Sequence, residues 1–548
     1  MLPARGGSKG VPRKVLRHLG GKPLILHSLH RLAQRLPRER LVVSTDSAEI
    51  GQVCEPFATI HPRSAELAGD AVTLDDVAVA VAGWLKQRGA SDGDLFMTLQ
   101  PTSPFLSLAT LERGLELLRG GAGSLLTVQR DGHLRWTRDD QGKPAPLYKA
   151  RVNRQWAAPC FVETGGIIAA RIGDVLAHKT RIVQPVELLE LGEMEGLDID
   201  THADWAMAEY FAQRKRIIIR GDASPKHGMG HVHRMLALAY ELASHRVTLV
   251  TRKDGGNELG AKFLAQAPFE LEAIDDEAAF YALLEREQPD IAILDVLDTQ
   301  PDYVQAVRKH AKCVVNFEDL GPGASHADIV INDLYTDLAP RENHWYSVQY
   351  SIVGPAFENT EPREQLRERV EKVLISFGGT DPNNLTLKAL AALQQLEFAG
   401  EVIVVLGPGY GHPPFELSSY GLRGEVHRSV QNMALLTRDA DVAITAAGRT
   451  VTELMTMGVP MITMCQNMNE LRHTHASSPY GVINLGLGQH IDPSTLAEHL
   501  RLVLDDKRLR EDMRARGFSA VRDRSNKRVA ESILKAAETI AAEKAKQS

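Results

Sequence analysis

The chain has 548 residues, of which 43% are hydrophobic and 24% are charged, and its formal net charge is -7. This length predicts about three or four domains, each large enough to bury a core. The acidic balance gives no electrostatic reason to expect nucleic acid as a partner. No apolar run reaches the roughly 18 residues that span a bilayer and no signal peptide is recognised, so we expect no membrane segment. The four cysteines lack metal-ligand spacing, which predicts reduced thiols and a cytoplasmic location.

Short apolar runs alternate with helical patterns along the whole chain, which is typical of parallel α/β domains. A basic junction at 214–216 and a charged, proline-containing stretch at 359–364 divide the runs into three groups. We therefore expect domains at residues 1–213, 214–365 and 366–548, with a terminal helix over 528–548 that frays. The expected strands are Leu41–Thr45, Leu95–Leu99, Ser124–Val128, Gly166–Ala170, Ile217–Arg220, Arg246–Thr251, Ile291–Asp295, Cys313–Phe317, Asp328–Asn332, Val373–Phe377, Glu401–Leu406, Asp441–Thr445 and Val459–Met464.

An acidic pair, Asp198 and Asp200, closes the first group. Alternate residues of an extended segment point the same way, so the two carboxylates can share one face. Two carboxylates together with substrate phosphates are a usual environment for Mg²⁺. The following residues, 201–204, have the pattern of a capping box, and acidic side chains are also favoured before a helix for purely structural reasons. From these residues alone, a metal site and a structural pair both remain open.

The chain opens with a glycine-rich and basic segment, Pro3–Lys14. Glycines let backbone N–H groups approach phosphate oxygens, and the basic side chains supply compensating charge. The segment is not a Walker A loop, because the Gly-Lys-Ser/Thr ending is absent. As a bare pattern it also fits a solvated basic terminus. Three further segments, 63–68, 99–104 and 153–155, follow expected elements, and each of them alone could be structural.

Together and in this order, the motifs resemble those of the acylneuraminate cytidylyltransferase family, which activates keto-sugar acids as CMP esters. The resemblance covers about residues 1–210. It implies a Rossmann-like nucleotidyltransferase domain, CTP and a nonulosonic acid as substrates, and a homodimer. The matching motifs are the glycine-rich opening, Ser44-Thr45-Asp46, Gln100–Pro104, Arg154-Gln155 with Pro159, and Asp198-Ile199-Asp200-Thr201.

The same resemblance implies roles for individual residues. Arg5 and Lys14 would act in catalysis beside the CTP phosphates, and Asp198 and Asp200 would hold Mg²⁺. The sugar C2 hydroxyl would attack the α-phosphorus of CTP, and pyrophosphate would leave, with catalysis mostly by alignment and charge neutralisation. The substrate-binding residues would be Gly6, Gly7, Ser8, Lys9, Arg63 and Gln100 towards the nucleotide, and Arg154 and Gln155 towards the sugar acid.

Two features depart from that family. Val15 stands where the family usually has an asparagine that helps to hold the nucleotide. Only Met1 and Leu2 precede Pro3, where the family has a longer central strand. Since strands of about five residues are normal in the middle of a parallel sheet, we expect either a start codon upstream or a weakened domain, and we favour the upstream start.

A glycine-containing segment, Gly221–Arg234, follows the strand expected at 217–220 and leads into an amphipathic helix. Glycines at the start of a helix allow close approach of a ligand, and the helix N-terminus favours phosphates. His231 lies at this point, where an imidazole can serve as a general base. We interpret the neighbouring His227 and His233 as surface or packed histidines.

Two similar segments follow in the third group. The glycine loop 378–384 comes directly after an expected strand, and 446–454 joins another strand to a helix. There Gly448 leaves room for a diphosphate. Glu453 can accept both ribose hydroxyls, although an acid near a helix N-terminus is also favoured without any ligand.

From about residue 215 to 530 the chain is similar to the nucleotide-sugar hydrolase of pseudaminic acid synthesis, which belongs with the two-Rossmann (GT-B) glycosyltransferases. The similarity implies that His231 is the catalytic base or orients a water molecule. The matching motifs are Gly228-x-Gly230-His231-x-x-Arg234, Glu318-Asp319-Leu320, Gly378-Gly379-Thr380-Asp381 and Gly448-Arg449-Thr450-x-x-Glu453. The implied nucleotide-binding residues are Gly230, Arg234, Gly379, Thr380, Gly448, Arg449, Thr450 and Glu453.

Two segments depart from the hydrolase: Asp295-Val296-Leu297 replaces its usual Asp-x-Tyr, and 465–473 matches only in part. The sequence thus predicts an α/β protein, with a Rossmann-like nucleotidyltransferase domain followed by a two-Rossmann GT-B-like region. Its expected function is bifunctional: CMP transfer from CTP to a nonulosonic acid, and hydrolysis of a nucleotide-linked amino sugar. The alternatives are a cytidylyltransferase fused to a working glycosyltransferase, or one half that only binds nucleotide.

Overall fold

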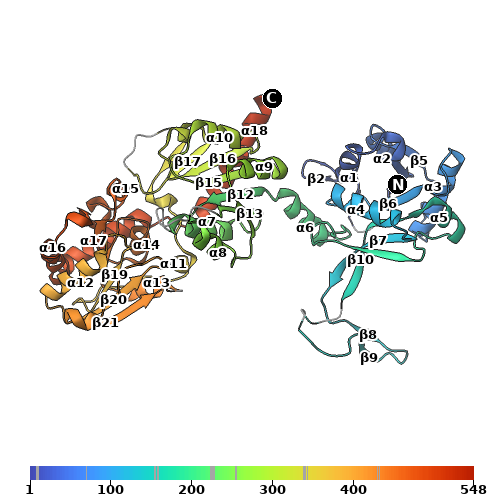
Figure 1. Cartoon of the computed structure of the whole chain (residues 1–548). Coiled ribbons are helices and arrows are strands. Elements are labelled where there is room, and N and C mark those ends of the chain that lie inside the picture. Colours follow the sequence, from blue (N-terminus) through green and yellow to red (C-terminus); the bar gives the residue numbers. More distant parts are fainter. Residues whose placement is uncertain are drawn as a thin grey trace. The chain divides into compact units, whose positions relative to one another are not determined.

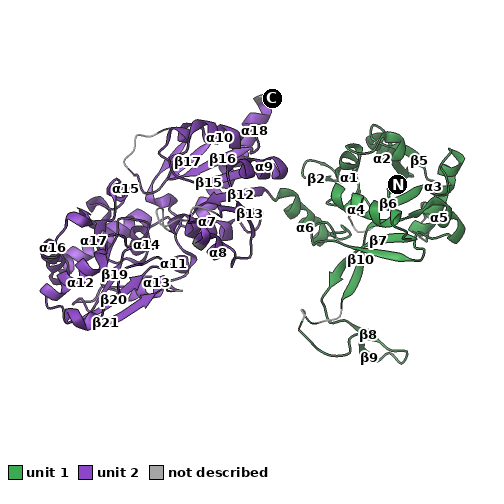
Figure 2. Ribbon diagram, viewed as in Figure 1, with its two compact units in different colours: residues 1–214 green, residues 215–548 purple. Residues whose placement is uncertain are grey.

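The computed structural model describes residues 1–7, 11–69, 71–153, 156, 159–222, 229–253, 256–336, 341, 343–428, 430 and 432–547. The chain forms two compact units, residues 1–214 and 215–548, which are coloured separately in Figure 2. The division falls between α6 (His202–Gln213) and β12 (Arg216–Gly221). No helix within the described ranges is long and apolar enough to cross a membrane.

Two groups of strands, in the orders β1-β4-β5 and β11-β7-β10-β6, build the sheet of unit 1. The first group is parallel, whereas β10 runs antiparallel to β6 and β7. The backbone of Met1 joins the groups: its amino nitrogen donates to Met97 O over 2.8 Å, and its carbonyl accepts from Leu99 N over 3.0 Å. The strands are β1 (Leu2–Pro3), β4 (Val42–Thr45), β5 (Thr59–Pro62), β6 (Leu95–Leu99), β7 (Ser124–Asp131), β10 (Cys160–Arg171) and β11 (Val186–Glu190).

The short first strand does occupy the middle of this sheet, which differs from the expectation that so few residues could not fill that place. Leu2 is fully buried and pairs in register with Val43 of β4. The segment suffices because β4 and β6 offer backbone partners on its two sides, so a few residues are ordered by their neighbours. The expectation of a start codon upstream stays a prediction.

Helices cover both faces of the unit 1 sheet, as expected for an α/β domain. One face packs against α1, α2 and α4, and the other against α3 and α5. β7 and β10 lead away from the sheet to a small hairpin of β8 and β9 (Figure 1). The bounds are α1 (Leu24–Ala33), α2 (Ala48–Cys54), α3 (Leu74–Gln87), α4 (Leu108–Arg119) and α5 (Ile172–His178), with β2 (His18–Leu19), β3 (Lys22–Pro23), β8 (Trp136–Arg138) and β9 (Pro144–Pro146).

Unit 2 contains two parallel sheets, each at the centre of a Rossmann-like lobe. The first lobe has the strand order β14-β13-β12-β15-β16-β17-β18, so the direction of winding reverses between β12 and β15. In such sheets, ligands bind outside the carboxyl ends of the strands at the point of reversal. The remaining elements of this lobe are α7 (Gly230–Glu241), β13 (Arg246–Arg252), α8 (Glu258–Leu264), β14 (Glu270–Ile274), α9 (Glu277–Glu287), β15 (Ile291–Asp295), α10 (Pro301–Arg308), β16 (Cys313–Phe317), β17 (Ile329–Asn332) and β18 (His344–Tyr346).

The second lobe repeats this plan with the order β21-β20-β19-β22-β23-β24, and the winding reverses between β19 and β22. The glycine loop at 378–381 follows β19, and the segment 446–449 follows β22. The elements are α11 (Pro355–Glu358), β19 (Lys372–Ser376), α12 (Leu385–Gln395), β20 (Glu401–Leu406), β21 (Arg423–Arg428), α13 (Met433–Asp439), β22 (Val442–Thr445), α14 (Thr450–Met457), β23 (Met461–Cys465), α15 (Met468–Leu471), β24 (Val482–Leu487), α16 (Pro493–Asp505) and α17 (Lys507–Val521). The α/β class and the two-Rossmann organisation expected for this half are confirmed.

The last helix, α18 (Asn526–Gln547), returns to the first lobe. Val529, Ile533 and Ala537 are buried in the core formed by α7 and the first-lobe sheet. The expectation of a fraying end is therefore wrong for this part of the helix. Its apolar positions are spaced on one helical face, and that face is covered by a sheet that the chain left some 200 residues earlier.

Candidate functional sites

The opening segment of unit 1 lies beside β4. Gly6 N donates to Asp46 Oδ1 over 2.9 Å, and the guanidinium of Arg63 donates to a β4 carbonyl over 3.0 Å. Burial lowers the pKa of Arg63, with Asp46 opposing and Arg5 reinforcing this direction, so these three side chains share one electrostatic environment. A Cβ at Gly7 would meet no atom of the described residues within 4 Å. Four predicted site residues lie outside the described residues: Ser8, Lys9, Arg154 and Gln155.

Lys14 brings the opening segment to the acidic pair. Its Nζ donates to Asp200 Oδ1 over 2.9 Å and to Ile199 O over 2.5 Å. Asp198 is enclosed: its Oδ1 is buried and has no hydrogen-bond partner within the described ranges. Burial raises the pKa of Asp198, and the neighbouring Asp200 carboxylate acts in the same direction. The Asp200 side chain is instead 71% exposed, so the pair presents one enclosed and one open carboxylate.

The capping box expected at 201–204 is confirmed. Asp204 N donates to Thr201 Oγ1 over 3.2 Å, and Thr201 N donates to Asp204 Oδ2 over 2.7 Å. Asp200 N also donates to Asp204 Oδ2 over 3.0 Å. The start of α6 therefore holds the backbone of the acidic pair in place.

Gly165 brings Gln100 and Asp198 together, and sequence reasoning missed it. It lies in an irregularity of β10 between Glu163 and Ile168, with φ of 68°. A Cβ here would overlap the side-chain amide of Gln100 and come within 3.5 Å of Asp198 Oδ2. Only glycine fits such a left-handed and crowded position. The signal that could have found it is a glycine pair inside a strand pattern, which often marks a bulge or a close approach.

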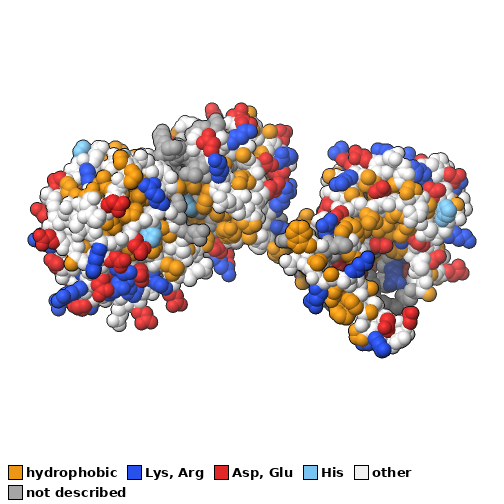
Figure 3. Space-filling model, turned by 60° about the horizontal axis from the view of Figure 1, so that its bottom comes forward, with side chains coloured by type: hydrophobic (Ala, Val, Ile, Leu, Met, Phe, Trp, Pro, Cys, Tyr) orange, Lys and Arg blue, Asp and Glu red, His pale blue; other side chains and the backbone are white. Residues whose placement is uncertain are grey.

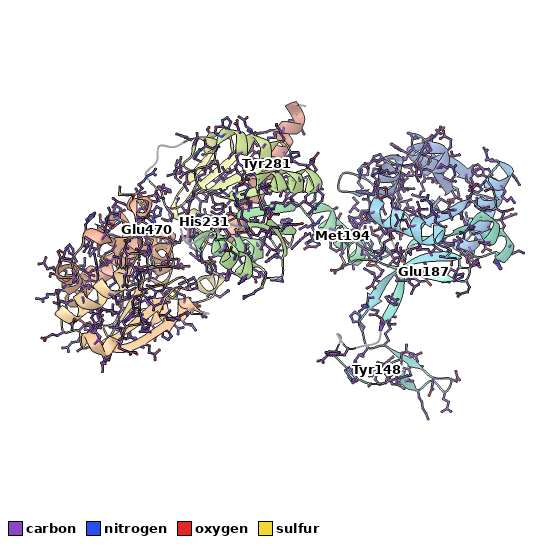
Figure 4. The ribbon with its side chains drawn as sticks, viewed as in Figure 1. Tyr148, Glu187, Met194, His231, Tyr281 and Glu470 are labelled. Carbon is purple, nitrogen blue, oxygen red and sulfur yellow. The ribbon has the colours of Figure 1, made fainter. Side chains whose placement is uncertain are left out.

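His231 lies in the first turn of α7, at the point where the first-lobe sheet reverses (Figure 4). Its Nδ1 donates to Asp295 Oδ1 over 2.6 Å, and Asp295 ends β15. A carboxylate on Nδ1 fixes the tautomer and leaves Nε2 to meet a substrate. Arg234 Nε donates to Asp295 Oδ2 over 2.6 Å, and Arg234 Nη2 donates to Oδ1. Arg234 is 2% exposed, so its guanidinium is placed to hold Asp295 rather than to reach a nucleotide.

Glu318 continues this arrangement from the end of β16. Nη1 of Arg234 and Nη1 of Arg449 both donate to Glu318 Oε1, the latter over 2.7 Å. Burial would raise the pKa of Glu318, but Arg234 and Arg449 hold it far below its usual range. Glu318 has φ of 53°, a left-handed conformation that is costly for a residue with a Cβ. We call His231, Asp295, Arg234, Glu318 and Arg449, in this order, the charge chain.

Arg449 belongs to the second lobe, where it lies at the N-cap position of α14. Its Nη2 donates to Ile352 O over 2.8 Å. A Cβ at Gly230 would lie 3.0 Å from Arg449 Cδ, and a Cβ at Gly379 would lie 3.9 Å from Met229 N. Met229 and Gly230 of the first lobe therefore meet Gly379 and Arg449 of the second lobe next to His231. Of the residues predicted for this site, the structure brings together Gly230, His231, Arg234, Gly379 and Arg449.

The backbone carbonyls of the turn at Gly448 accept hydrogen bonds from side chains that the sequence interpretation did not single out. His475 Nε2 donates to Gly448 O over 3.1 Å, and His473 Nδ1 donates to Ala447 O over 2.8 Å. Burial lowers the pKa of His475 to about 3, so it acts here as a neutral donor. Glu470 (labelled in Figure 4) accepts from Gln466 N over 2.7 Å, and burial raises its pKa to about 7. The short spacing 470–473–475 is the signal that could have pointed to this support.

The other predicted nucleotide-binding residues lie around this turn. Thr450 is the first residue of α14, and burial raises the pKa of Glu453 in the same helix to about 7. Thr380 packs closely against Gly409 in the loop after β20. The sequence interpretation mentioned Asp295 only as the retained first residue of Asp295-Val296-Leu297, a segment that departs from Asp-x-Tyr at Leu297. Its signal was its place: an acid at the end of a buried strand beside the reversal point.

Charges elsewhere do not concentrate on the visible surface. In Figure 3, Lys and Arg side chains are interspersed with Asp and Glu side chains over the faces shown of both units. This agrees with the small net charge of -7 for 548 residues.

Comparison with known proteins gives matches for both parts of the chain. The model of the Cytidylyltransferase family matches residues 1–122. The CMP-N,N'-diacetyllegionaminic acid synthase of Legionella pneumophila is 33% identical over 220 residues, which are 38% of this chain and 93% of that protein. The spore coat polysaccharide biosynthesis protein SpsG of Bacillus subtilis is 26% identical over 314 residues, which are 53% of this chain and 90% of that protein.

Two further matches cover a smaller share or show weaker likeness. An uncharacterized protein of Methanocaldococcus jannaschii is 29% identical over 271 residues, and the chain spans only 56% of its length. Among solved structures, MurG of Acinetobacter baumannii is 16% identical, with a TM-score of 0.45 over 59% of this chain and 99% of that one. The family model lies within unit 1, and the Legionella synthase is matched over nearly its whole length. The chain therefore belongs, through its first unit, to the cytidylyltransferase family.

Proposed function

We propose that unit 1 transfers CMP from CTP to a keto-sugar acid of the nonulosonic class. The observation that carries this is the similarity to the Legionella synthase, whose name describes such a product. The C2 hydroxyl of the sugar acid would attack the α-phosphorus, the bond to the β-phosphate oxygen would break, and pyrophosphate would leave. Arg5, Arg63 and Lys14 would compensate phosphate charge, which is the main task in such transfers.

Mg²⁺ is part of this proposal, with Asp198 and Asp200 as its protein ligands. No group of three or more His, Cys, Asp or Glu side chains within the described residues could hold a metal alone. The pair nevertheless fits Mg²⁺, because the buried Asp198 Oδ1 has no hydrogen-bond partner among the described residues and this ion is usually held by one or two carboxylates plus phosphates. When bound, the ion would neutralise charge on the phosphates. Lys14 keeps the open carboxylate of Asp200 beside the enclosed one.

For unit 2 we propose transfer of a sugar from a nucleoside diphosphate sugar to a hydroxyl acceptor, with His231 as the base. The carrying observation is the 2.6 Å hydrogen bond between Nδ1 and Asp295. Nε2 would take the acceptor proton while the acceptor oxygen bonds to the anomeric carbon. The bond from that carbon to the diphosphate oxygen would break, and the nucleoside diphosphate would leave with the electron pair.

Hydrolysis, in which water is the acceptor, remains the second candidate. His231 would serve as the base for hydrolysis as well. The order of the sequence motifs in unit 2, which resembles that of the hydrolase, favours this reaction. The departures at 295–297 and 465–473 favour a different acceptor instead, as does the name of the Bacillus relative, a spore coat polysaccharide biosynthesis protein. We therefore place sugar transfer ahead of hydrolysis of a nucleotide-linked amino sugar.

One assay tests both activities in the full chain. Pyrophosphate release is measured with CTP, Mg²⁺ and several nonulosonic acids, and UDP or GDP release is measured with nucleotide sugars. Strict dependence on an added sugar acceptor supports transfer, whereas release without acceptor supports hydrolysis. Failure to use CTP with any acid would overturn the proposal for unit 1. A folded His231→Ala variant that turns over sugar nucleotide normally would overturn the role of the base.

A further inference from the structure

We propose that Arg449 of the second lobe is a positioning residue for His231 of the first lobe and acts through the charge chain. This inference rests on the proposed function of unit 2 and adds a dependence of the base on lobe closure. The base then would not be an independent feature of the first lobe. It would reach its working state only when the second lobe supplies its cation.

The link between the two lobes is made at a single atom, Glu318 Oε1. Glu318 Oε1 accepts from Nη1 of Arg234 and from Nη1 of Arg449, so one atom joins guanidinium groups of two lobes. The same Arg234 guanidinium also donates to both carboxylate oxygens of Asp295. Asp295 Oδ1 is also the atom that holds His231 Nδ1. Charges alternate from Asp295 through Arg234 and Glu318 to Arg449, and each link of the chain is a charge-assisted hydrogen bond of the strong kind.

A balance of charge explains why the second arginine matters. Without Arg449, the single guanidinium of Arg234 would face Asp295 and Glu318 as hydrogen-bond partners, with Asp333 Oδ1 at 3.7 Å. The Arg234, Asp295 and Asp333 side chains are at most 2% exposed, so water screens these charges poorly. Arg449 supplies the second cation and reaches within 4.0 Å of Asp333 as well. Its removal would leave an excess negative charge close to the base.

The backbone supports the same interpretation. Glu318 keeps a left-handed φ of 53°, a conformation that is unfavourable for a residue with a side chain. That conformation aims its carboxylate between the two lobes. Arg449 directly follows Gly448 and lies at the N-cap position of α14. The aliphatic part of its side chain lies against Gly230 in the first turn of α7. A movement of the second lobe must therefore move Arg449, and with it the hydrogen bond from Arg449 to Glu318.

The sign of the electrostatic effect makes the proposal testable. Loss of the positive charge of Arg449 favours protonated His231, so the ring should titrate at higher pH. Loss of the negative charge of Glu318 favours the neutral ring, so it should titrate at lower pH. Among the described residues, Asp295 and Arg234 lie within hydrogen-bond distance of His231, and Glu318 interacts with it electrostatically. At the other end of the charge chain, Arg449 interacts with His233, His473 and His475, and Asp333 with Arg234 and Arg449.

The experiment is an NMR titration of the full chain labelled with ¹³C at histidine Cε1, with His231→Gln used for assignment. We expect Arg449→Gln to raise the His231 midpoint, Glu318→Gln to lower it, and the double variant to return near the wild type. Arg449→Lys, which keeps the charge, should titrate close to the wild type. Arg501→Gln, at an exposed arginine of α16 in the same lobe, is the matched control and should change nothing.

Shifts of both single variants in one direction, or no shift in folded protein, would overturn the proposal. If Glu318→Gln does not fold, the contrast of Arg449→Gln with Arg449→Lys decides alone. The acidic limb of kcat/KM for sugar nucleotides should move with the NMR midpoint. Absence of turnover by the wild type would refute the proposed function but would leave the titration result standing, so the two failures are distinguishable.

Discussion

The two units hold the charges of their candidate sites in opposite ways. In unit 1, Lys14 pairs with an Asp200 side chain that is 71% exposed. In unit 2, Arg234 and Asp295 are 1% and 2% exposed and are held by two parallel hydrogen bonds. Exposed pairs contribute about 0–1 kcal/mol and exchange partners easily, whereas breaking a buried pair costs about 3–5 kcal/mol.

This difference matches what each proposed reaction requires. A nucleotide triphosphate with Mg²⁺ brings its own charges, so the protein needs groups that can change partners when the ligand arrives. A general base must keep its orientation before the substrate binds, so a buried and fully paired support suits it. Because the two sites share one chain, each serves as an internal control for variants in the other.

The largest effect is expected for Asp295→Asn. The amide keeps the shape but removes the charge that orients His231 and balances Arg234. We expect nucleoside diphosphate release to fall by about 100-fold or more, because an incorrectly oriented base loses most of its contribution. Pyrophosphate release by unit 1 in the same preparation should not change. Normal turnover by the variant would show that the buried support is not needed.

Asp198→Asn should impair the proposed Mg²⁺ and CTP site of unit 1. It replaces the enclosed carboxylate whose buried Oδ1 has no partner in the part of the chain that the structure describes. We expect CTP turnover to fall by about 100-fold, with a higher Mg²⁺ concentration needed for half-maximal rate. Asp200→Asn should have a smaller effect, since that side chain is exposed. Equal Mg²⁺ titration curves for the wild type and Asp198→Asn would refute the metal assignment.

Gly165→Ala tests how far the open site still depends on fixed geometry. The new Cβ would push the Gln100 amide and impose a left-handed backbone on alanine, at a cost of about 1–2 kcal/mol. We expect about a tenfold loss of CTP turnover and a lower melting temperature of unit 1. Gly142→Ala is a matched control, because it has a positive φ but meets no neighbouring atom. Similar losses in both variants would assign the effect to backbone strain alone.

The smallest effect concerns pH. Burial raises the pKa of Glu470 from 4.5 to about 7. A carboxyl group with a raised folded pKa stabilises the fold below its unfolded pKa, and this contribution is lost as pH rises through the folded value. We expect the melting temperature of unit 2 to fall between pH 5 and 8, and Glu470→Gln to reduce that fall by about 2 °C. Glu498→Gln, at an exposed position of α16, should leave the slope unchanged.

The strands that the sequence predicted correctly lie inside the sheets, where both faces are buried and the apolar run is continuous. β15 and β16 were predicted with their observed bounds, and every residue in them is buried. Strands at the sheet edges were missed because one face or more meets solvent and the apolar signal weakens. β21, for example, is exposed at all but one position. The missed edge strands are β5, β11, β14, β18, β21 and β24.

Sequence alone determined the order of the motifs, the α/β class, the acidic pair with its capping box, and His231 as the candidate base. These follow from local periodicity and from residue types that stand near one another in the chain. Tertiary structure decided which distant groups meet. The return of α18 to the first lobe, the place of Met1 between β4 and β6, and the pairing of Arg449 with Glu318 each join segments more than 40 residues apart. No local pattern records such contacts, because buried charges are satisfied by whichever partner the fold brings within hydrogen-bond distance.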